Sequence, residues 1–117
     1  MNTQEVANRL VELCRKGQNM QAVQELYGKN IVSKEISGSP NELTHGFDAV
    51  TKKVESFLAS IEAFHGVEVS DPNVAENHFS CAMKMDLTFK EQGRVTMNEI
   101  NVYKVEDGKI VEEQFFY

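Results

Sequence analysis

The sequence contains no tryptophan, only two prolines and only two cysteines, and no apolar run approaches the ~20 residues that a membrane-spanning helix needs. The chain opens directly into an amphipathic pattern that includes Glu5 and Glu12, which is unlike a signal or transit peptide. Cys14 and Cys81 occupy apolar positions without C-x-x-C spacing, so we expect two small buried hydrophobes; a reactive thiol is the alternative. These absences predict a cytoplasmic protein with no membrane partner.

Charge and motifs narrow the class of function further. The formal net charge is −6, and the basic residues are scattered among acids, with no stripe that would neutralise phosphates, so we expect no nucleic-acid partner. The three histidines (His45, His65 and His78) lack H-x-x-x-H spacing, which predicts no metal site. No Gly-rich phosphate loop, dinucleotide fingerprint or nucleophile elbow is present, so we expect function without a cofactor.

The N-terminal half reads as helical. The length of 117 residues suits one domain spanning 1–117, large enough for a core without disulfides. An apolar stripe from Val6 to Cys14 predicts a first helix that Gly17 ends. A second helix is expected from a cap at Asn19 to Gly28, and the longest from Phe47 to Ala63. A short strand over residues 31–36 is expected between the second and third helices.

The C-terminal half reads as antiparallel strands. Residues 79–90 alternate strictly between apolar and polar side chains, which predicts a strand with one buried face. A two-residue turn at Gln92-Gly93 would pair Met83 with Val102, and a type I′ turn at Asp107-Gly108 would pair Val102 with Glu113. The two hairpins together predict the inner face of the last two strands: Asn98, Ile100, Val102, Lys104, Val111, Glu113, Phe115 and Tyr117.

The opposite face of the same strands is predicted to form a homodimer interface. Its large apolar members are Met97, Tyr103, Ile110 and Phe116, which stand among Glu99, Asn101, Glu112 and Gln114. Such a mixture of large apolar and neutral polar groups is more typical of an interface than of a solvated face. We therefore expect a homodimer through the outer face of the sheet.

Three segments resemble the nuclear transport factor 2-like superfamily, and within it the SnoaL-like polyketide cyclase and ketosteroid isomerase group. They are Glu25-Leu26-Tyr27-Gly28, residues 44–50 (THGFDAV) and residues 102–112 (VYKVEDGKIVE). The resemblance implies an α+β fold, a cystatin-like conical barrel with three N-terminal helices packed on a strongly curved antiparallel sheet. It also implies an internal pocket and a homodimer. It does not imply one chemistry, because this fold hosts many activities.

The sequence departs from the SnoaL-like pattern on its last strand. Many members continue Gly-Lys-Ile-Val-Glu with His-Trp-Asp, whereas this chain places Phe115 where the acidic residue of the cyclases is expected. Glu113 is the strongest remaining candidate for a catalytic residue. Burial among apolar neighbours would raise its pKa and suit it to general acid–base catalysis. The structural alternative is that Lys104 pairs with Glu113 across the hairpin and holds it ionised.

The other candidates would line the pocket. Asn98 and Tyr117 are expected to face each other and to orient a carbonyl group, and His45 is expected near the pocket mouth by the resemblance. The predicted ligand-binding set is Tyr27, His45, Met83, Met85, Asn98, Val102, Phe115 and Tyr117. Structural roles in the core or at the surface are the alternatives for these residues.

Two functions remain open. The first is a domain that binds a small apolar organic molecule without classical cyclase catalysis. The second is a cofactor-independent isomerase or cyclase that moves a proton on a carbonyl-bearing metabolite, with Glu113 as the acid or base. The missing acid on the last strand favours the first.

Overall fold

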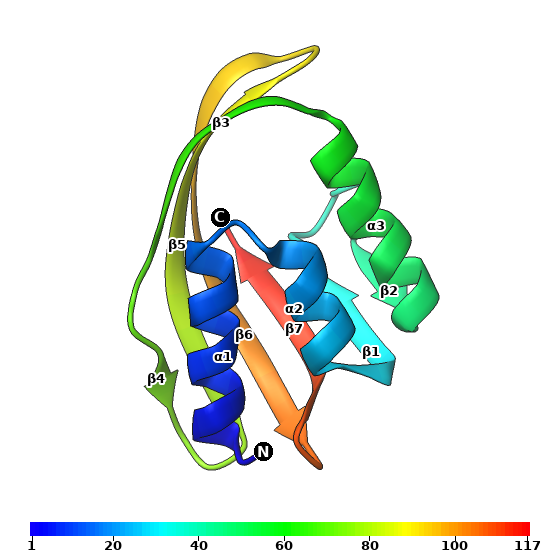
Figure 1. Ribbon diagram of the computed structural model, residues 1–117. Coiled ribbons are helices and arrows are strands. Elements are labelled where there is room, and N and C mark those ends of the chain that lie inside the picture. The colour runs from blue at the N-terminus through cyan, green and yellow to red at the C-terminus, as the bar shows by residue number, and fades with distance from the viewer.

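The computed structural model describes residues 1–117, which form three helices and a seven-stranded sheet. Figure 1 shows the helices gathered on one face of the sheet. In chain order the elements are α1 (Thr3–Arg15), α2 (Asn19–Leu26), β1 (Tyr27–Lys34), β2 (Leu43–His45), α3 (Phe47–Ala59), β3 (Ile61–Val69), β4 (Asn73–Val74), β5 (His78–Phe89), β6 (Gly93–Glu106) and β7 (Lys109–Phe116). The predicted α+β class, with helices covering one face, is confirmed.

The sheet is mixed, which corrects the antiparallel prediction. Its strand order is β2-β1-β7-β6-β5-β3, with β4 paired to β5, and β1 runs parallel to β7 while the other pairs are antiparallel. The edge strands β2 and β3 do not pair with each other, so the sheet stays open. The expectation of a strongly curved sheet is wrong for this chain.

Local sequence explains where α1 starts and ends. The Asn2 side chain accepts a hydrogen bond from the backbone N–H of Glu5, and the Glu5 side chain accepts one from the N–H of Asn2, which completes a capping box. Gly17 has a φ of +70°, a left-handed conformation that glycine adopts without strain, and it follows the last turn of the helix. The predicted first helix and its glycine stop are confirmed.

The boundaries of the other two helices differ from the predictions. Asn19 lies inside α2 and does not cap it, because Gln18 holds the cap position without a side-chain hydrogen bond. The chain enters β1 at Tyr27, where pairing with β7 replaces the last predicted helical turn. Helix α3 ends at Ala59, and β3 begins at Ile61. The apolar residues after Ala59 belong to strand pairing with β5, which periodicity over a short run did not distinguish from a helix.

The β6–β7 hairpin has the predicted type of turn. Asp107 and Gly108 have positive φ angles of 52° and 74°, and Glu106 pairs with Lys109. A β-bulge at Val111 then shifts the register by one residue. Beyond the bulge Glu113 pairs with Tyr103, not with Val102.

The β5–β6 turn is longer than predicted, and this changes the inner face of β6. Phe89 pairs with Gly93, so the loop holds three residues (90–92) where two were expected. Met83 consequently pairs with Glu99 and not with Val102. Because side chains alternate along a strand, an odd shift exchanges the two faces. The inner side chains of β6 are Met97, Glu99, Asn101, Tyr103 and Val105, and the predicted inner set Asn98, Ile100, Val102 and Lys104 faces outward.

This exchange also removes most of the predicted dimer surface. Tyr103 and Ile110 are buried at 2% and 0% exposure, and Met97 packs against the core, so these three do not lie on the outer face. Phe116 does lie there, and it pairs across the ladder with Ile100; both side chains are about half exposed.

The core lies between the helices and the inner face of the sheet. Its largest fully buried side chains include Phe79, Leu10, Leu13 and Leu26, and the Phe79 ring stacks on Tyr103 at a centroid distance of 4.7 Å. No helix is long and apolar enough to cross a membrane.

Candidate functional site

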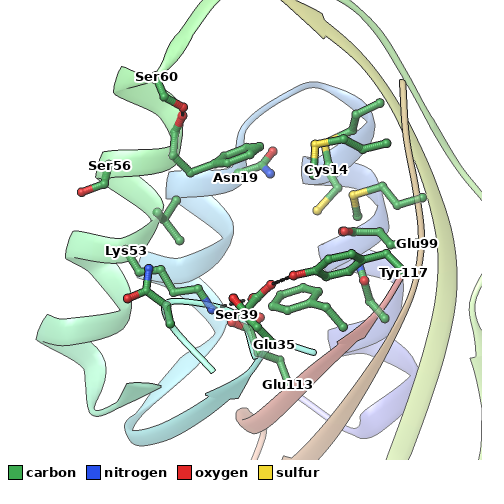
Figure 2. A pocket seen from close by; sticks show the side chains of 18 of the residues that line it. Cys14, Asn19, Glu35, Ser39, Lys53, Ser56, Ser60, Glu99, Glu113 and Tyr117 are labelled. Atoms are coloured by element: carbon green, nitrogen blue, oxygen red, sulfur yellow. Dashed lines mark hydrogen bonds and ion pairs between the residues drawn. The ribbon is translucent and has the colours of Figure 1, made fainter. Parts of the chain in front are cut away.

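A large cavity opens between the helices and the concave face of the sheet (Figure 2). Its volume is about 830 Å³, and half of its 28 lining residues are hydrophobic. Helix α1 contributes Leu10 and Cys14, and strand β5 contributes Met83 and Met85. Polar lining residues come from α3, β6 and β7 and from Glu35 just after β1, and others lie in the loops at residues 39–41 and 90–92.

Glu113 lies at the base of the cavity and is held from β1. The parallel register of β1 and β7 sets Ser33 directly opposite Glu113, and the Ser33 hydroxyl donates to Glu113 Oε2 at 2.7 Å. The Tyr27 hydroxyl donates to Glu113 Oε1. Glu113 is only 3% exposed. Both carboxylate oxygens are therefore occupied by hydroxyl donors of the protein itself.

Lys53 extends this network from α3. Its ammonium donates to Ser33 Oγ at 2.9 Å and pairs with Glu35 Oε2 at 2.7 Å, and it lies 5.3 Å from the centroid of the Phe115 ring. The Tyr117 hydroxyl donates to the other Glu35 oxygen at 2.8 Å. Figure 2 shows Lys53 reaching from the helix toward Glu35 and Glu113. The only lysine of this network is thus engaged by two protein partners.

Glu99 and Asn101 form the unpaired part of the wall. They stand two residues apart on the inner face of β6, and both line the cavity. Asn101 is 1% exposed, yet neither its Nδ2 nor its Oδ1 atom has a hydrogen-bond partner. The Glu99 carboxylate forms no ion pair. A buried polar group without a partner costs about 1–3 kcal/mol, so these atoms are costly to the fold and are available to a ligand.

Burial changes the acid–base properties of these groups. Desolvation is the main cause that raises the pKa of Glu99 to about 6; the neighbouring Asn101 side chain and Lys53 oppose the rise, and the negative charges of Glu35 and Glu113 add to it. Desolvation also raises the pKa of Glu113, against the hydrogen bonds from its hydroxyl partners. Burial raises the pKa of Tyr27 well above its ordinary value. Glu99 therefore keeps its proton to a higher pH than an exposed glutamate does.

The cavity brings together most of the predicted site residues. Tyr27, Met83, Met85, Phe115 and Tyr117 line it together with Glu113. Whether these residues bind a ligand stays a prediction.

Three predicted site residues lie elsewhere, and the predicted partner of Glu113 does too. His45 is exposed on β2, and Asn98 and Val102 lie on the outer face of β6 because of the longer turn. Lys104 is on that outer face as well, where its closest carboxylate is Glu106 at 3.3 Å. The expected pairing of Lys104 with Glu113 is wrong, and Ser33 and Tyr27 take its place.

The sequence analysis does not predict five polar residues of the site: Ser33, Glu35, Lys53, Glu99 and Asn101. The predicted registers place Glu99 and Asn101 on the outer face. The correct turn length would have moved both inward, because alternation fixes all side chains of a strand once one pair is known. Lys53 lies three residues after Val50 and four before Phe57, so it shares a helix face with these apolar residues, but a lone lysine at such a position is normally solvent-exposed.

The cysteines behave as small hydrophobes. Both are free and buried, and Cys14 lines the cavity. Burial raises the pKa of the Cys14 thiol to about 12 and that of Cys81 to about 11, which keeps both protonated and weakly nucleophilic at neutral pH. No group of three or more histidine, cysteine, aspartate or glutamate side chains is arranged to hold a metal ion.

Comparison with known proteins identifies the fold. A protein from Mesorhizobium loti, described as a candidate SnoaL-like polyketide cyclase with the further label carbohydrate phosphatase, is 36% identical, and the match covers 100% of both chains with a TM-score of 0.94. No curated protein shows significant similarity to the chain.

More distant structures share the fold alone. A Catenulispora acidiphila protein with a ketosteroid isomerase-like fold, solved in complex with trimethylamine, is 15% identical with a TM-score of 0.76, and the match covers 97% of this chain and 85% of that one. A Mycobacterium tuberculosis protein in complex with estradiol-17beta-hemisuccinate is 13% identical with a TM-score of 0.77, covering 100% and 95%. Other matching structures are nuclear transport factor 2-like proteins.

The sequence matches the family profile described as a SnoaL-like domain over residues 1–117. Together with the full-length similarity to the Mesorhizobium loti protein, this match shows that the chain belongs to the SnoaL-like domain family, with a nuclear transport factor 2-like fold.

Proposed function

We propose that this SnoaL-like protein binds a small, mainly apolar organic molecule in its cavity, with the polar end of the ligand at Asn101 and Glu99. The observation that carries the proposal is Asn101, an amide with two unpaired atoms in the wall of a largely apolar cavity. A ligand that hydrogen-bonds to this amide would offset the cost of burying it without a partner, about 1–3 kcal/mol.

The size and lining of the cavity support the same function. Ligand pockets commonly measure about 300–1,000 Å³ and combine apolar walls with a few convergent polar groups. The volume here is about 830 Å³, and Met83, Met85 and Phe115 supply apolar wall. Two proteins of the same fold hold small organic molecules, trimethylamine in one case and an estradiol derivative in the other.

The last strand argues against classical cyclase catalysis. Phe115 occupies the position where the cyclases have an acidic residue, and its ring packs beneath Lys53. Glu113, the alternative acid, has both oxygens engaged by Ser33 and Tyr27. To accept a proton from a ligand, Glu113 would first have to release one of these hydroxyl donors.

A second candidate function is a cofactor-independent enzyme that moves a proton next to a carbonyl group. One observation favours it: Glu99 has no ion-pair partner, lines the cavity and has a pKa raised to about 6. An acid or base with a pKa near the working pH is efficient in proton transfer. In this version Glu99, not Glu113, takes the role of acid or base, and Asn101 Nδ2 donates to the carbonyl oxygen.

The binding function is tested with acetylnaphthalene, a bicyclic ketone small enough for the cavity. We expect it to raise the melting temperature of the wild-type protein, and Asn101→Leu to weaken binding about tenfold, the effect of one lost hydrogen bond. Asn98→Leu is the matched control, because Asn98 lies on the outer face of the same strand. Equal effects of the two substitutions would contradict the proposed site.

The same ketone separates binding from catalysis. If Glu99 moves protons, the methyl protons next to the carbonyl should exchange with deuterium in heavy water faster with the protein than without it. Proton NMR would follow the loss of the methyl signal, and Glu99→Gln should abolish the acceleration. If the ketone binds but its methyl protons exchange no faster, the protein binds this class of ligand without catalysing proton transfer.

A further inference from the structure

The charges that line the cavity do not balance. The carboxylates of Glu35, Glu99 and Glu113 face a single ammonium, that of Lys53. The remaining charged lining residues, Lys90 and Glu91, are exposed in the β5–β6 turn and offset each other. Most surface carboxylates are solvated and need no partner, but these three lie in a wall with limited access to water.

The Lys53 ammonium does not interact equally with all three carboxylates. It is 2.7 Å from Glu35 Oε2 and bonds to Ser33 Oγ, which in turn donates to Glu113. The Lys53 and Glu35 side chains are only 18% and 15% exposed, so this pair is fixed inside the wall. Glu99 remains as the carboxylate without a positive partner. Its raised pKa, about 6, is the expected consequence of that position.

Asn101 provides a second, independent observation. Asn101 is 1% exposed and neither of its side-chain polar atoms forms a hydrogen bond of normal geometry; it stands beside Glu99 on the same face of β6 and lowers the pKa of that carboxyl group. The two Glu99 oxygens and Asn101 Oδ1 are hydrogen-bond acceptors, whereas Asn101 Nδ2 is the only donor of the pair. The unfilled groups therefore require a ligand that brings more donors than acceptors.

We propose that the cavity selects organic cations, namely a protonated primary or secondary amine on an apolar body, with the ammonium group between Glu99 and Asn101 Oδ1. This inference rests on the proposed binding function and adds the charge of the ligand. A protonated amine supplies two or three N–H donors and the missing positive charge at once. A hydroxyl group supplies one donor and no charge, and a carboxylate would be repelled by Glu99 and Glu113.

The test compares three probes that share one apolar body: naphthylmethylamine, naphthalenemethanol and naphthoate. Binding to the full chain is measured by isothermal titration calorimetry at neutral pH, where an alkylamine is protonated. We expect the amine to bind at least tenfold more tightly than the alcohol, since hydrogen bonds to charged groups are about twice as strong as neutral ones, and we expect no binding of naphthoate. Glu99→Gln should reduce the affinity for the amine to the affinity for the alcohol.

Two controls make the result specific. Glu62→Gln removes the same charge from an exposed position on β3 outside the cavity, and it should leave the amine preference unchanged. Binding of the alcohol to Glu99→Gln at wild-type affinity shows that the variant is folded with an intact cavity. A preference for the amine that survives Glu99→Gln, or equal affinity of the wild type for amine and alcohol, would overturn the inference while leaving the binding function in place. Failure of all three probes and of acetylnaphthalene would refute the binding function, and this inference with it.

Discussion

Replacing Glu99 with glutamine is expected to make the protein more stable at neutral pH. Glutamine keeps the size of the side chain but carries no charge, so it removes the cost of holding an ionised carboxylate in the cavity wall. The pKa of Glu99 is raised from 4.5 to about 6, chiefly by desolvation. A raised pKa in an acid means that the folded protein binds this proton more tightly than the unfolded chain does.

The sign and size of the effect follow from this linkage. Between about pH 4.5 and 6 the unfolded chain has lost the Glu99 proton while the folded protein still holds it, so the free energy of unfolding falls as the pH rises. Above about pH 6 the loss is complete. One pKa unit corresponds to about 1.36 kcal/mol, so the shift of Glu99 lowers stability at pH 7 by about 2 kcal/mol. Glu99→Gln should recover up to this amount at pH 7 and gain almost nothing near pH 4.

Urea unfolding followed by far-ultraviolet circular dichroism measures the effect, because the chain has no tryptophan for fluorescence. The informative quantity is the stability difference between variant and wild type at pH 7, minus the same difference near pH 4. The neighbouring charged groups that face Glu99 are Glu35, Glu113 and Lys53, and they are present in both proteins. The control Glu62→Gln should show no such pH-dependent gain. A variant that is destabilised at pH 7, or whose effect is the same at both pH values, would refute the reasoning.

Two further predictions concern the network below the cavity and the outer face of the sheet. Glu113→Gln should destabilise the protein by about 1–3 kcal/mol in urea unfolding, because the amide nitrogen cannot accept a hydrogen bond and one of the Tyr27 and Ser33 hydroxyls loses its acceptor; unchanged stability would show that the carboxylate is not needed to hold these strands. The homodimer stays a prediction, and its basis is now the exposed pair Ile100 and Phe116. Light scattering at micromolar concentration should give twice the 13.2 kDa chain mass, and Ile100→Asp should reduce the mass to that of the monomer. A monomeric wild type would contradict the interface.

The sequence identified the family and most elements because these depend on local patterns. The apolar stripe of α1, the alternation along β5 and the Asp107-Gly108 turn each lie within one contiguous segment, and all three appear in the structure as predicted. The parallel pairing of β1 with β7 is different, since it joins segments about 80 residues apart through registers that no local pattern encodes. That pairing is also what sets Ser33 against Glu113.

The errors at the site come from two small features of the hairpins. The β5–β6 loop lies at residues 90–92 and not at 92–93, which shifts that register by three residues, and the bulge at Val111 shifts the β6–β7 register by one; each odd shift exchanges the faces of a strand. Glu113 on β7 faces inward, as predicted. Glu99 and Asn101 on β6 also face inward, whereas the predicted register puts them on the outer face. Loop length and bulges depend on the twist of the assembled sheet, so alternation alone cannot fix them.

The two inner strands differ in how the polar side chains on their inner faces are hydrogen-bonded. On β7, Glu113 is fully satisfied by hydroxyls of β1, and its network ties β1, β7 and α3 together. On β6, Glu99 forms no ion pair and Asn101 forms no hydrogen bond of normal geometry, so a leucine or methionine at either position would be expected to pack against the apolar wall at lower cost. A fold under selection for stability alone would not keep two adjacent unpaired groups there. This contrast with β7 is the reason for placing the proposed ligand site at the β6 pair.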